Sequence, residues 1–162
     1  MRIVVFSGNS NSGKTTLIEK LSLALQPNKK ISIIKHDPKD KAIFDTKGKD
    51  SYRFYESGAN IAILSPTQTT LRFHTSLNIT EIIKYFKDCD YLFIEGLKEL
   101  PFPKITIARE NLDERFFAFS NALAIDNSIK DYSKIPKNID ILNLNNTQEI
   151  LHWINTHIKD TL

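Results

Sequence analysis

One short stretch of the chain restricts its fold more than any other: FSGNSNSGKTTL, which spans Phe6–Leu17. Four of its residues fit the spacing G-x-x-x-x-G-K-[ST]: Gly8, Gly13, Lys14 and Thr15. In such a loop, glycine lets the backbone approach an anion closely, the lysine ammonium reaches the β- and γ-phosphates, and the threonine hydroxyl ligates Mg²⁺. The stretch therefore predicts a phosphate-binding loop.

The residues on either side of this loop have the pattern that such a loop requires. Ile3–Phe6 is a continuous apolar run typical of a buried parallel strand, and Leu17, Leu21 and Leu25 recur at helical spacing. A helix that begins directly after the loop directs its partial positive charge at the same anion. Strand, loop and helix thus follow one another in the required order.

Composition limits the class of protein and the kinds of partner. The chain has 162 residues, 41% of them hydrophobic and 25% charged, which suits one globular domain, residues 1–162. Its net charge of +3 is spread along the sequence, so we expect phosphorylated ligands rather than nucleic acid. No apolar run approaches the roughly 18 residues of a membrane span, and we expect neither a membrane partner nor a signal peptide. The single cysteine, Cys89, forms no disulfide within the chain, and we expect a buried small side chain in a reducing cytoplasm.

Strand and helix signals alternate along the rest of the chain. Strands are expected at residues 31–34, 61–64, 91–94, 104–108, 122–125 and 139–144. Helices are expected at residues 49–57, after Asn78 and after Asn146, where Glu follows at capping-box spacing, and Trp153 is expected in the core. This order predicts an α/β protein with a P-loop NTPase fold, whose mostly parallel sheet binds ligands at its carboxyl edge. Residues 70–74 alternate polar and apolar side chains, which predicts an antiparallel hairpin extension.

A phosphate loop usually works with a second acidic group that reaches the Mg²⁺ from the end of another buried strand. The run YLFIE places Glu95 at the end of such a strand, so Glu95 is the candidate carboxylate for the metal or for a water molecule. The alternative is a solvated glutamate at a strand end. Asp90, at the opposite end of the strand, is interpreted as a turn residue.

The segment Ile33–Ala59 holds most of the remaining polar side chains, and its position after the second strand resembles a switch region. His36 and Asp37 are expected at the carboxyl edge of the sheet, and Asp50 and Arg53 near the start of a helix whose N-terminus favours anions. Two simpler interpretations stay open. Asp50 would merely cap its helix, and His36 would be an exposed loop imidazole.

Five pieces of the sequence together resemble one family of P-loop proteins. They are GNSNSGKTTLIEKL, IIKHD, GKDSYRFYESGA, YLFIEGLK and PFPKI, in this order, over residues 2–105. The resemblance is to the molybdopterin-guanine dinucleotide biosynthesis adaptor family, MobB. It implies GTP rather than ATP, Mg²⁺, a homodimer, slow or negligible turnover, and a partner guanylyltransferase that joins GMP to the molybdenum cofactor. Direct binding of molybdopterin stays open.

The resemblance also implies which residues form the site. For the phosphates and the metal they are Gly8, Ser10, Ser12, Gly13, Lys14, Thr15 and Thr16. The second motif of the family falls on His36, Asp37, Asp45, Lys49, Asp50, Ser51 and Arg53, and the third on Glu95, Gly96, Lys98 and Lys104. As catalytic candidates we name Glu95 to orient water, with Arg53 or Lys98 to neutralise developing charge within the dimer.

Two positions depart from the family pattern. Pro38 and Lys39 stand where the family often has further histidines, so a role that needs a histidine pair is not expected. Asn11 stands where the family tends to have glycine, within the predicted phosphate-binding loop. Asparagine adopts left-handed backbone conformations more readily than most residues, so we expect Asn11 to be tolerated there.

Two other functions compete with the adaptor. A small-molecule kinase would use the same loop, but the five arginines are scattered at Arg2, Arg53, Arg72, Arg109 and Arg115 and outline no lid. A GTP-driven metal-insertion chaperone would be expected to carry Cys-x-x-Cys or a histidine-rich tract, and the sequence has neither. The sequence also lacks an Asn/Thr-Lys-x-Asp motif, so the preference for guanine rests on the resemblance alone.

Overall fold

The computed structural model describes residues 1–161, and the chain divides into two compact units. The first, here called the sheet unit, consists of Met1–His36 and Phe86–Leu162. The second, the hairpin unit, consists of Asp37–Tyr85. In residues 1–161 no helix combines the length and the apolar character needed to cross a membrane. A single-domain organisation stays a prediction.

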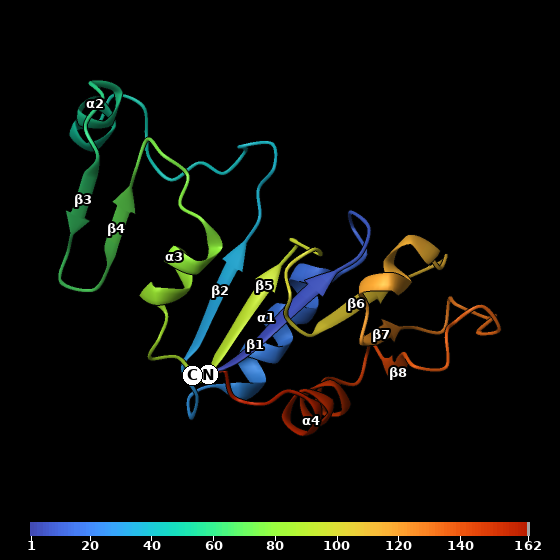
Figure 1. Cartoon of the computed structure of the whole chain (residues 1–162). Helices are drawn as coiled ribbons and strands as arrows, with labels where there is room; N and C mark the ends of the chain where they lie inside the picture. The colour runs from blue at the N-terminus through green and yellow to red at the C-terminus, as the bar shows by residue number, and fades with distance from the viewer. Residues whose placement is uncertain (162) are drawn as a thin grey trace. The chain divides into compact units, whose positions relative to one another are not determined.

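The sheet unit is built on a six-stranded parallel sheet (Figure 1). In spatial order its strands are β2 (Ile31–Lys35), β5 (Tyr91–Glu95), β1 (Arg2–Ser7), β6 (Lys104–Ala108), β7 (Ala122–Ile125) and β8 (Asp140–Asn143). Every neighbouring pair is parallel, so all six strands end at the same edge. The central strands are buried along almost their whole length, as their continuous apolar sequences predict.

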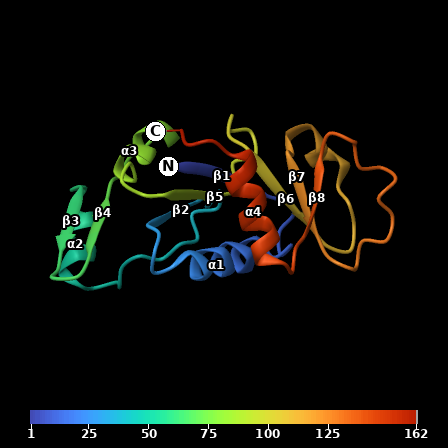
Figure 2. The ribbon, with the colours of Figure 1, turned by 90° about the horizontal axis from the view of Figure 1, so that it is seen from below.

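Two helices, α1 (Lys14–Leu25) and α4 (Thr147–His157), lie side by side against one face of this sheet (Figure 2). The helical spacing of Leu17 and Leu21 buries both side chains in the same core as Phe6 and Phe93. Asn146 begins α4, and its side chain accepts a hydrogen bond from the backbone N–H of Glu149, as the capping pattern predicts.

The core position predicted for Trp153 is confirmed. Its side chain is buried with the residues of α1 and the sheet, and its ring N–H donates a hydrogen bond of 2.7 Å to Asp140. Cys89 is also buried, and Asp90 accepts a hydrogen bond from the backbone N–H of Lys30 at a turn, as expected.

The opposite face of the sheet at β6 and β7 is covered by η1, a 3₁₀ helix at Glu114–Phe119 that the sequence does not predict. A second core cluster forms there: Ala108, Leu123, Ile125, Ile129 and Ile139, with Leu112, Phe117 and Ile135 packed against it. Three buried hydroxyl groups tie this covering segment to the strands. Those of Ser7 and Thr106 lie 2.6 Å apart, and those of Thr106 and Ser120 also lie 2.6 Å apart.

The hairpin unit contains α2 (Asp50–Glu56), β3 (Ile61–Leu64), β4 (Thr69–Arg72) and α3 (Ile79–Tyr85). Strands β3 and β4 form a separate two-stranded antiparallel sheet, which confirms the predicted hairpin. The strand at 61–64 pairs with β4 in this hairpin and lies outside the parallel sheet, although its apolar run resembles a buried strand.

Asp45 joins the segments of the hairpin unit. Its carboxylate accepts hydrogen bonds from the Ser51 hydroxyl at 3.0 Å and from the guanidinium of Arg72 at 3.1 Å. The Arg72 guanidinium also lies 3.7 Å from the centre of the Tyr55 ring, on which the His74 ring stacks. Asp45 and Ser51 thus have a structural role, because their contacts hold segments of the hairpin unit together.

Candidate functional site

The loop between β1 and α1 is held against β6 so closely that one position excludes any side chain. Gly8 has φ +131°, and a Cβ atom there would lie 2.3 Å from the carbonyl oxygen of Ile107. Gly13, at the end of the loop, has φ +99°. Asn11 adopts φ +61°, the left-handed conformation expected for an asparagine in place of glycine. The glycines of the motif are therefore required by the loop geometry itself.

Lys14 reaches back across the loop. Its ammonium donates hydrogen bonds to the carbonyl oxygens of Gly8, at 3.1 Å, and Asn9, at 2.7 Å. Burial lowers the pKa of Lys14, the negative charge of Glu95 opposes this shift, and the nearby Lys35 adds to it. A bound phosphate would supply a further negative charge and favour the protonated form.

Glu95 meets the loop at the carboxyl edge of the sheet. In the parallel register of β1, β5 and β2, Glu95 lies beside Phe6 on one side and Lys35 on the other. Its carboxylate accepts a hydrogen bond of 3.0 Å from the Thr15 hydroxyl and forms an ion pair of 3.4 Å with Lys35. The structure thus brings together Thr15 and Glu95, the two residues that the sequence indicates for a metal.

These groups line a polar pocket of about 410 Å³, here called the phosphate pocket. Its lining consists of Ser10, Asn11, Gly13, Lys14, Thr15, Thr16, Lys35 and Glu95. Two lysines and one glutamate make this lining positive, which suits an anion. Lys35 is a residue that the sequence analysis missed; its place at the end of β2, directly beside Glu95, is the signal that points to it.

The geometry fits a chain of phosphate groups. Helix α1 begins after Gly13 with no side chain that caps its first N–H groups, so those donors are available to an anion. The hydroxyl of Ser12 is buried and has no hydrogen-bond partner. Among residues 1–161 no group of three His, Cys, Asp or Glu side chains could hold a metal, so Mg²⁺ would depend on Thr15, Glu95 and phosphate oxygens.

Two further predicted residues, His36 and Lys98, lie in the segments that follow β2 and β5 and line a separate pocket. The backbone N–H of His36 donates to the carbonyl of Glu95 at 3.0 Å, and the His36 side chain packs against Gly96. The ammonium of Lys98 lies 5.2 Å from the centre of the Phe116 ring, a cation–π distance. The roles of His36 and Lys98 in ligand binding stay predictions.

Lys104 is buried at the start of β6, where its ammonium donates a hydrogen bond of 2.8 Å to the carbonyl oxygen of Phe102. The predicted residues of the second motif that follow His36 belong to the hairpin unit. The carboxylate of Asp37 accepts hydrogen bonds from the backbone N–H groups of Lys41, at 2.6 Å, and Ala42, at 2.7 Å, and so shapes the loop after β2. Asp50 is the first residue of α2, after the capping position Lys49, and lies 4.0 Å from Arg53 in an exposed ion pair. A contribution of Asp37, Asp50 or Arg53 to nucleotide binding stays a prediction.

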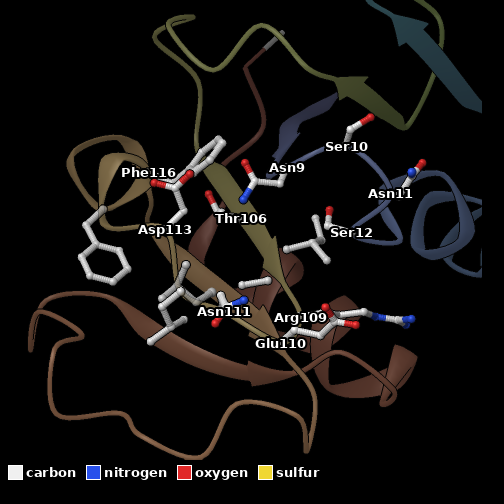
Figure 3. A pocket seen from close by; sticks show the side chains of 15 residues that line it. Asn9, Ser10, Asn11, Ser12, Thr106, Arg109, Glu110, Asn111, Asp113 and Phe116 are labelled. Carbon is white, nitrogen blue, oxygen red and sulfur yellow. The ribbon is translucent and has the colours of Figure 1, made fainter.

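A second pocket of about 410 Å³, here called the side pocket, lies against the loop residues Asn9–Ser12 (Figure 3). Its remaining lining comes from β6, from the segment after it and from η1 and β7: residues 106–113, 116, 117 and 123. At its edge the guanidinium of Arg109 would lie 3.4 Å from a Cβ atom on Gly13, and Asp126 holds Arg109 by an ion pair of 3.3 Å. The sequence analysis missed this pocket.

The architecture defines the class of protein. A parallel sheet, a glycine-dependent loop between β1 and the uncapped start of α1, and an acidic residue at the end of the strand beside β1 are the features of a P-loop NTPase fold. This fold suits nucleotide binding in general.

Comparisons with known proteins then identify the family. The family model for molybdopterin guanine dinucleotide synthesis protein B, MobB, matches residues 3–127. The chain is 31% identical over 151 residues to the molybdopterin-guanine dinucleotide biosynthesis adapter protein of Haemophilus influenzae, which is 84% of each chain. The chain belongs to the MobB family. The family and this relative are both described as proteins of molybdopterin guanine dinucleotide synthesis.

Two more similarities agree with this family. A Methanocaldococcus jannaschii protein that bears a provisional form of the adapter name is 36% identical over 116 residues, 68% of this chain and 48% of that protein. The chain thus spans about half the length of that relative. The crystal structure of Bacillus subtilis MobB superposes with a TM-score of 0.68 at 26% identity, covering 87% of this chain and 90% of that one.

Proposed function

We propose that this protein is a GTP-binding adaptor of the cytoplasm, which assists a partner guanylyltransferase in attaching GMP to molybdopterin and hydrolyses GTP only weakly. The observation that carries the proposal is the phosphate pocket, where Lys14, Thr15 and Glu95 converge in a chain that belongs to the MobB family. The preference for guanine rests on the family resemblance.

Specific groups would hold the nucleotide. The backbone N–H groups at the start of α1 and the ammonium of Lys14 would bind the phosphates, with Lys35 adding positive charge. Thr15 and Glu95 would provide two ligands for Mg²⁺, since Mg²⁺ in such sites takes one or two protein groups and completes its shell with phosphate oxygens and water. When bound, Mg²⁺ neutralises charge on the phosphates.

Slow hydrolysis follows from the lining of this pocket. Fast GTP hydrolysis in P-loop proteins uses, beyond the loop lysine and Mg²⁺, an arginine on the developing charge and a glutamine that positions the attacking water. Glu95 stays the candidate here to orient water, with Arg53 or Lys98 to neutralise charge within the dimer. Arginine and glutamine are both missing from the lining of the phosphate pocket, and Arg109 is bound to Asp126 at the edge of the side pocket. We expect turnover far below the ordinary enzyme median of about 10 per second.

Equilibrium binding tests the nucleotide. GTP should bind in preference to ATP, with Mg²⁺ required, and Lys14→Ala should abolish binding because the ammonium on the phosphates is lost. Lys20→Ala is the matched control, since Lys20 is an exposed lysine of the same helix. Equal competition by ATP would contradict the guanine assignment and favour a small-molecule kinase.

Reconstitution tests the adaptor role. Purified guanylyltransferase should attach GMP to molybdopterin faster with this protein than without it, and Lys14→Ala should remove the gain. Phosphate release by the protein alone is measured in parallel. Rapid release with no effect on guanylylation would refute the proposal.

A homodimer is the second part of the proposal. Leu71 of β4 is 44% exposed, Phe73 is 37% exposed and Leu64 of β3 is 76% exposed, so the hairpin presents apolar side chains to water. Burial of these side chains by a second copy would stabilise both chains. Light scattering at micromolar concentration should give twice the monomer mass of 18.6 kDa, and a monomer would contradict it.

A further inference from the structure

We propose that the side pocket binds a 2-amino-4-oxopyrimidine ring, the ring edge that guanine and pterins share, with the Asp113 carboxylate accepting two adjacent N–H groups of that ring. The proposal rests on the proposed function, because it assigns a place to one of the two ring systems that a guanylated molybdopterin contains. It differs from the assignment of the phosphate pocket, which concerns phosphates and metal only.

The volume and the lining of the side pocket allow it to hold a planar ring. Its volume of about 410 Å³ falls in the range of small-molecule sites, roughly 300–1,000 Å³. Leu112, Phe117 and Leu123 provide apolar and aromatic lining, and these side chains belong to the core at this face of the sheet. Asn9, Asn111 and Asp113 place polar groups along the same lining (Figure 3). Nine of the fifteen residues that line the pocket are polar or charged, Glu110 among them, so the pocket offers a ligand many hydrogen-bonding groups beside its apolar wall.

Asp113 has the chemistry that this ring edge requires. Hydrogen bonds from Arg115 hold the pKa of Asp113 at about 2, so its carboxylate is ionised and only accepts hydrogen bonds. Guanine and pterins present a ring N–H beside an amino group, and a carboxylate accepts from both at once. Adenine lacks this pair of donors.

The present side-chain partner of Asp113 lies at the surface. Arg115 donates to the carboxylate at 2.8 Å and 2.6 Å, but its side chain is 81% exposed. The side chain of Asp113 is only 16% exposed, so its carboxylate needs a new partner when Arg115 leaves, and the two N–H groups of the ring would be that partner. Arg115 can therefore turn into solvent while a ring takes its place on Asp113.

The loop residue Asn9 connects the side pocket to the phosphate pocket. Its side-chain amide lies close enough to the Asp113 carboxylate to help lower the pKa of that group, and Figure 3 shows the two side chains near each other. Its carbonyl oxygen accepts a hydrogen bond from the ammonium of Lys14. A ring on Asp113 and a phosphate on Lys14 therefore act on the same residue, and binding of one should change the affinity for the other.

The test compares Asp113→Asn with Asp131→Asn. Asparagine keeps the capping role of Asp113 at the start of η1 but removes the charge and replaces one acceptor by a donor. Asp131 is the matched control, since it is an exposed aspartate that also accepts a backbone hydrogen bond in a turn. The probes are GTP, ITP, which lacks the amino group, and unsubstituted pterin, followed by its fluorescence. A thermal melt verifies that each variant is folded.

Two results support the proposal and separate the two sources of the ring. If the nucleotide base occupies the pocket, wild type should bind GTP about tenfold more tightly than ITP, and Asp113→Asn should abolish this difference. If a pterin occupies the pocket, Asp113→Asn should weaken pterin binding about tenfold and leave the affinity for GTP unchanged. Pterin should then also bind to the wild type in the presence of saturating GTP. In either case Arg115→Ala should tighten binding of the ring, because Arg115 no longer competes for the Asp113 carboxylate. If Asp113 has only a structural role, Arg115→Ala should not increase the affinity for either probe.

Unchanged affinities for all three probes in Asp113→Asn would overturn the proposal. The proposal would also be overturned if the wild-type protein did not bind pterin and bound GTP no more tightly than ITP. If GTP binding then still depends on Lys14, the proposed function stands and only the ring assignment fails. If Lys14→Ala has no effect either, the proposed function fails as well.

Discussion

Replacing Gly8 by alanine tests the claim that the loop is held against β6 by close contact. Two effects add at this position. The backbone has φ +131°, which strains any residue with a Cβ atom, and the new Cβ would lie 2.3 Å from the carbonyl oxygen of Ile107. That carbonyl belongs to a buried strand of the sheet, so it has little room to move.

The magnitude follows from these two effects. The backbone conformation costs an alanine about 1–2 kcal/mol. Overpacking against a rigid neighbour adds about 1–3 kcal/mol. Gly8→Ala should therefore lower the free energy of unfolding by about 2–5 kcal/mol and the Tm by roughly 5–15 °C for a chain of this size. Gly13→Ala should cost only about 1–2 kcal/mol, since a Cβ on Gly13 meets its nearest atom, in Arg109, at an ordinary 3.4 Å.

Urea unfolding without nucleotide measures both variants. The single tryptophan, Trp153, reports specifically on the sheet unit, where both glycines lie. Both positions have a positive φ, +131° at Gly8 and +99° at Gly13, so we expect most of the difference between the variants to come from the contact with Ile107. Equal destabilisation of the two variants would refute the reasoning, and the loop would then have room to move away from β6.

Three other changes have expected outcomes. Asp140→Ala should lower the free energy of unfolding by about 1 kcal/mol, because the Trp153 N–H loses its acceptor; an unchanged urea midpoint would contradict this. Thr15→Val should remove the Mg²⁺ dependence of GTP binding while metal-free binding persists, and titrations with and without Mg²⁺ would show any failure. Hydrogen bonds from Ser128 lower the pKa of Asp126, so the unfolded chain takes up this proton more readily and stability should fall as the pH drops below the ordinary aspartate pKa of about 4. Urea titrations at several pH values should show a smaller loss for Asp126→Asn, and an identical pH profile would exclude this contribution.

Sequence alone predicts the phosphate-binding loop because the residues that form it are contiguous in the chain. The motif, the strand before it and the helix after it lie within 25 residues, and each has its own periodicity. Glu95 is placed beside Thr15 by a simple rule, since parallel strands end at the same edge of a sheet. The hairpin strand β4 follows from alternation of polar and apolar residues.

The remaining features depend on contacts that no local pattern encodes. The side pocket joins Asn9 to Asp113, more than 100 residues apart in the sequence. The helix η1 has no 3.6-residue period by which it could be recognised. The run IAIL of β3 resembles a buried strand, yet three of its four residues are exposed, because β3 pairs in the hairpin and not in the large sheet.

The hydrogen bonds among the three hydroxyl groups that connect η1 to the sheet all run in one direction. The Ser120 hydroxyl donates its only proton to the carbonyl oxygen of Phe116, so it must accept from Thr106, and Thr106 must in turn accept from Ser7. Each hydroxyl in this series therefore donates in the direction from Ser7, the residue before Gly8, toward Phe116 in the wall of the side pocket. A valine at Thr106 would keep the shape but leave the Ser7 proton without its acceptor and Ser120 without its donor. The end of β1 and the wall of the side pocket would then lose their common restraint together.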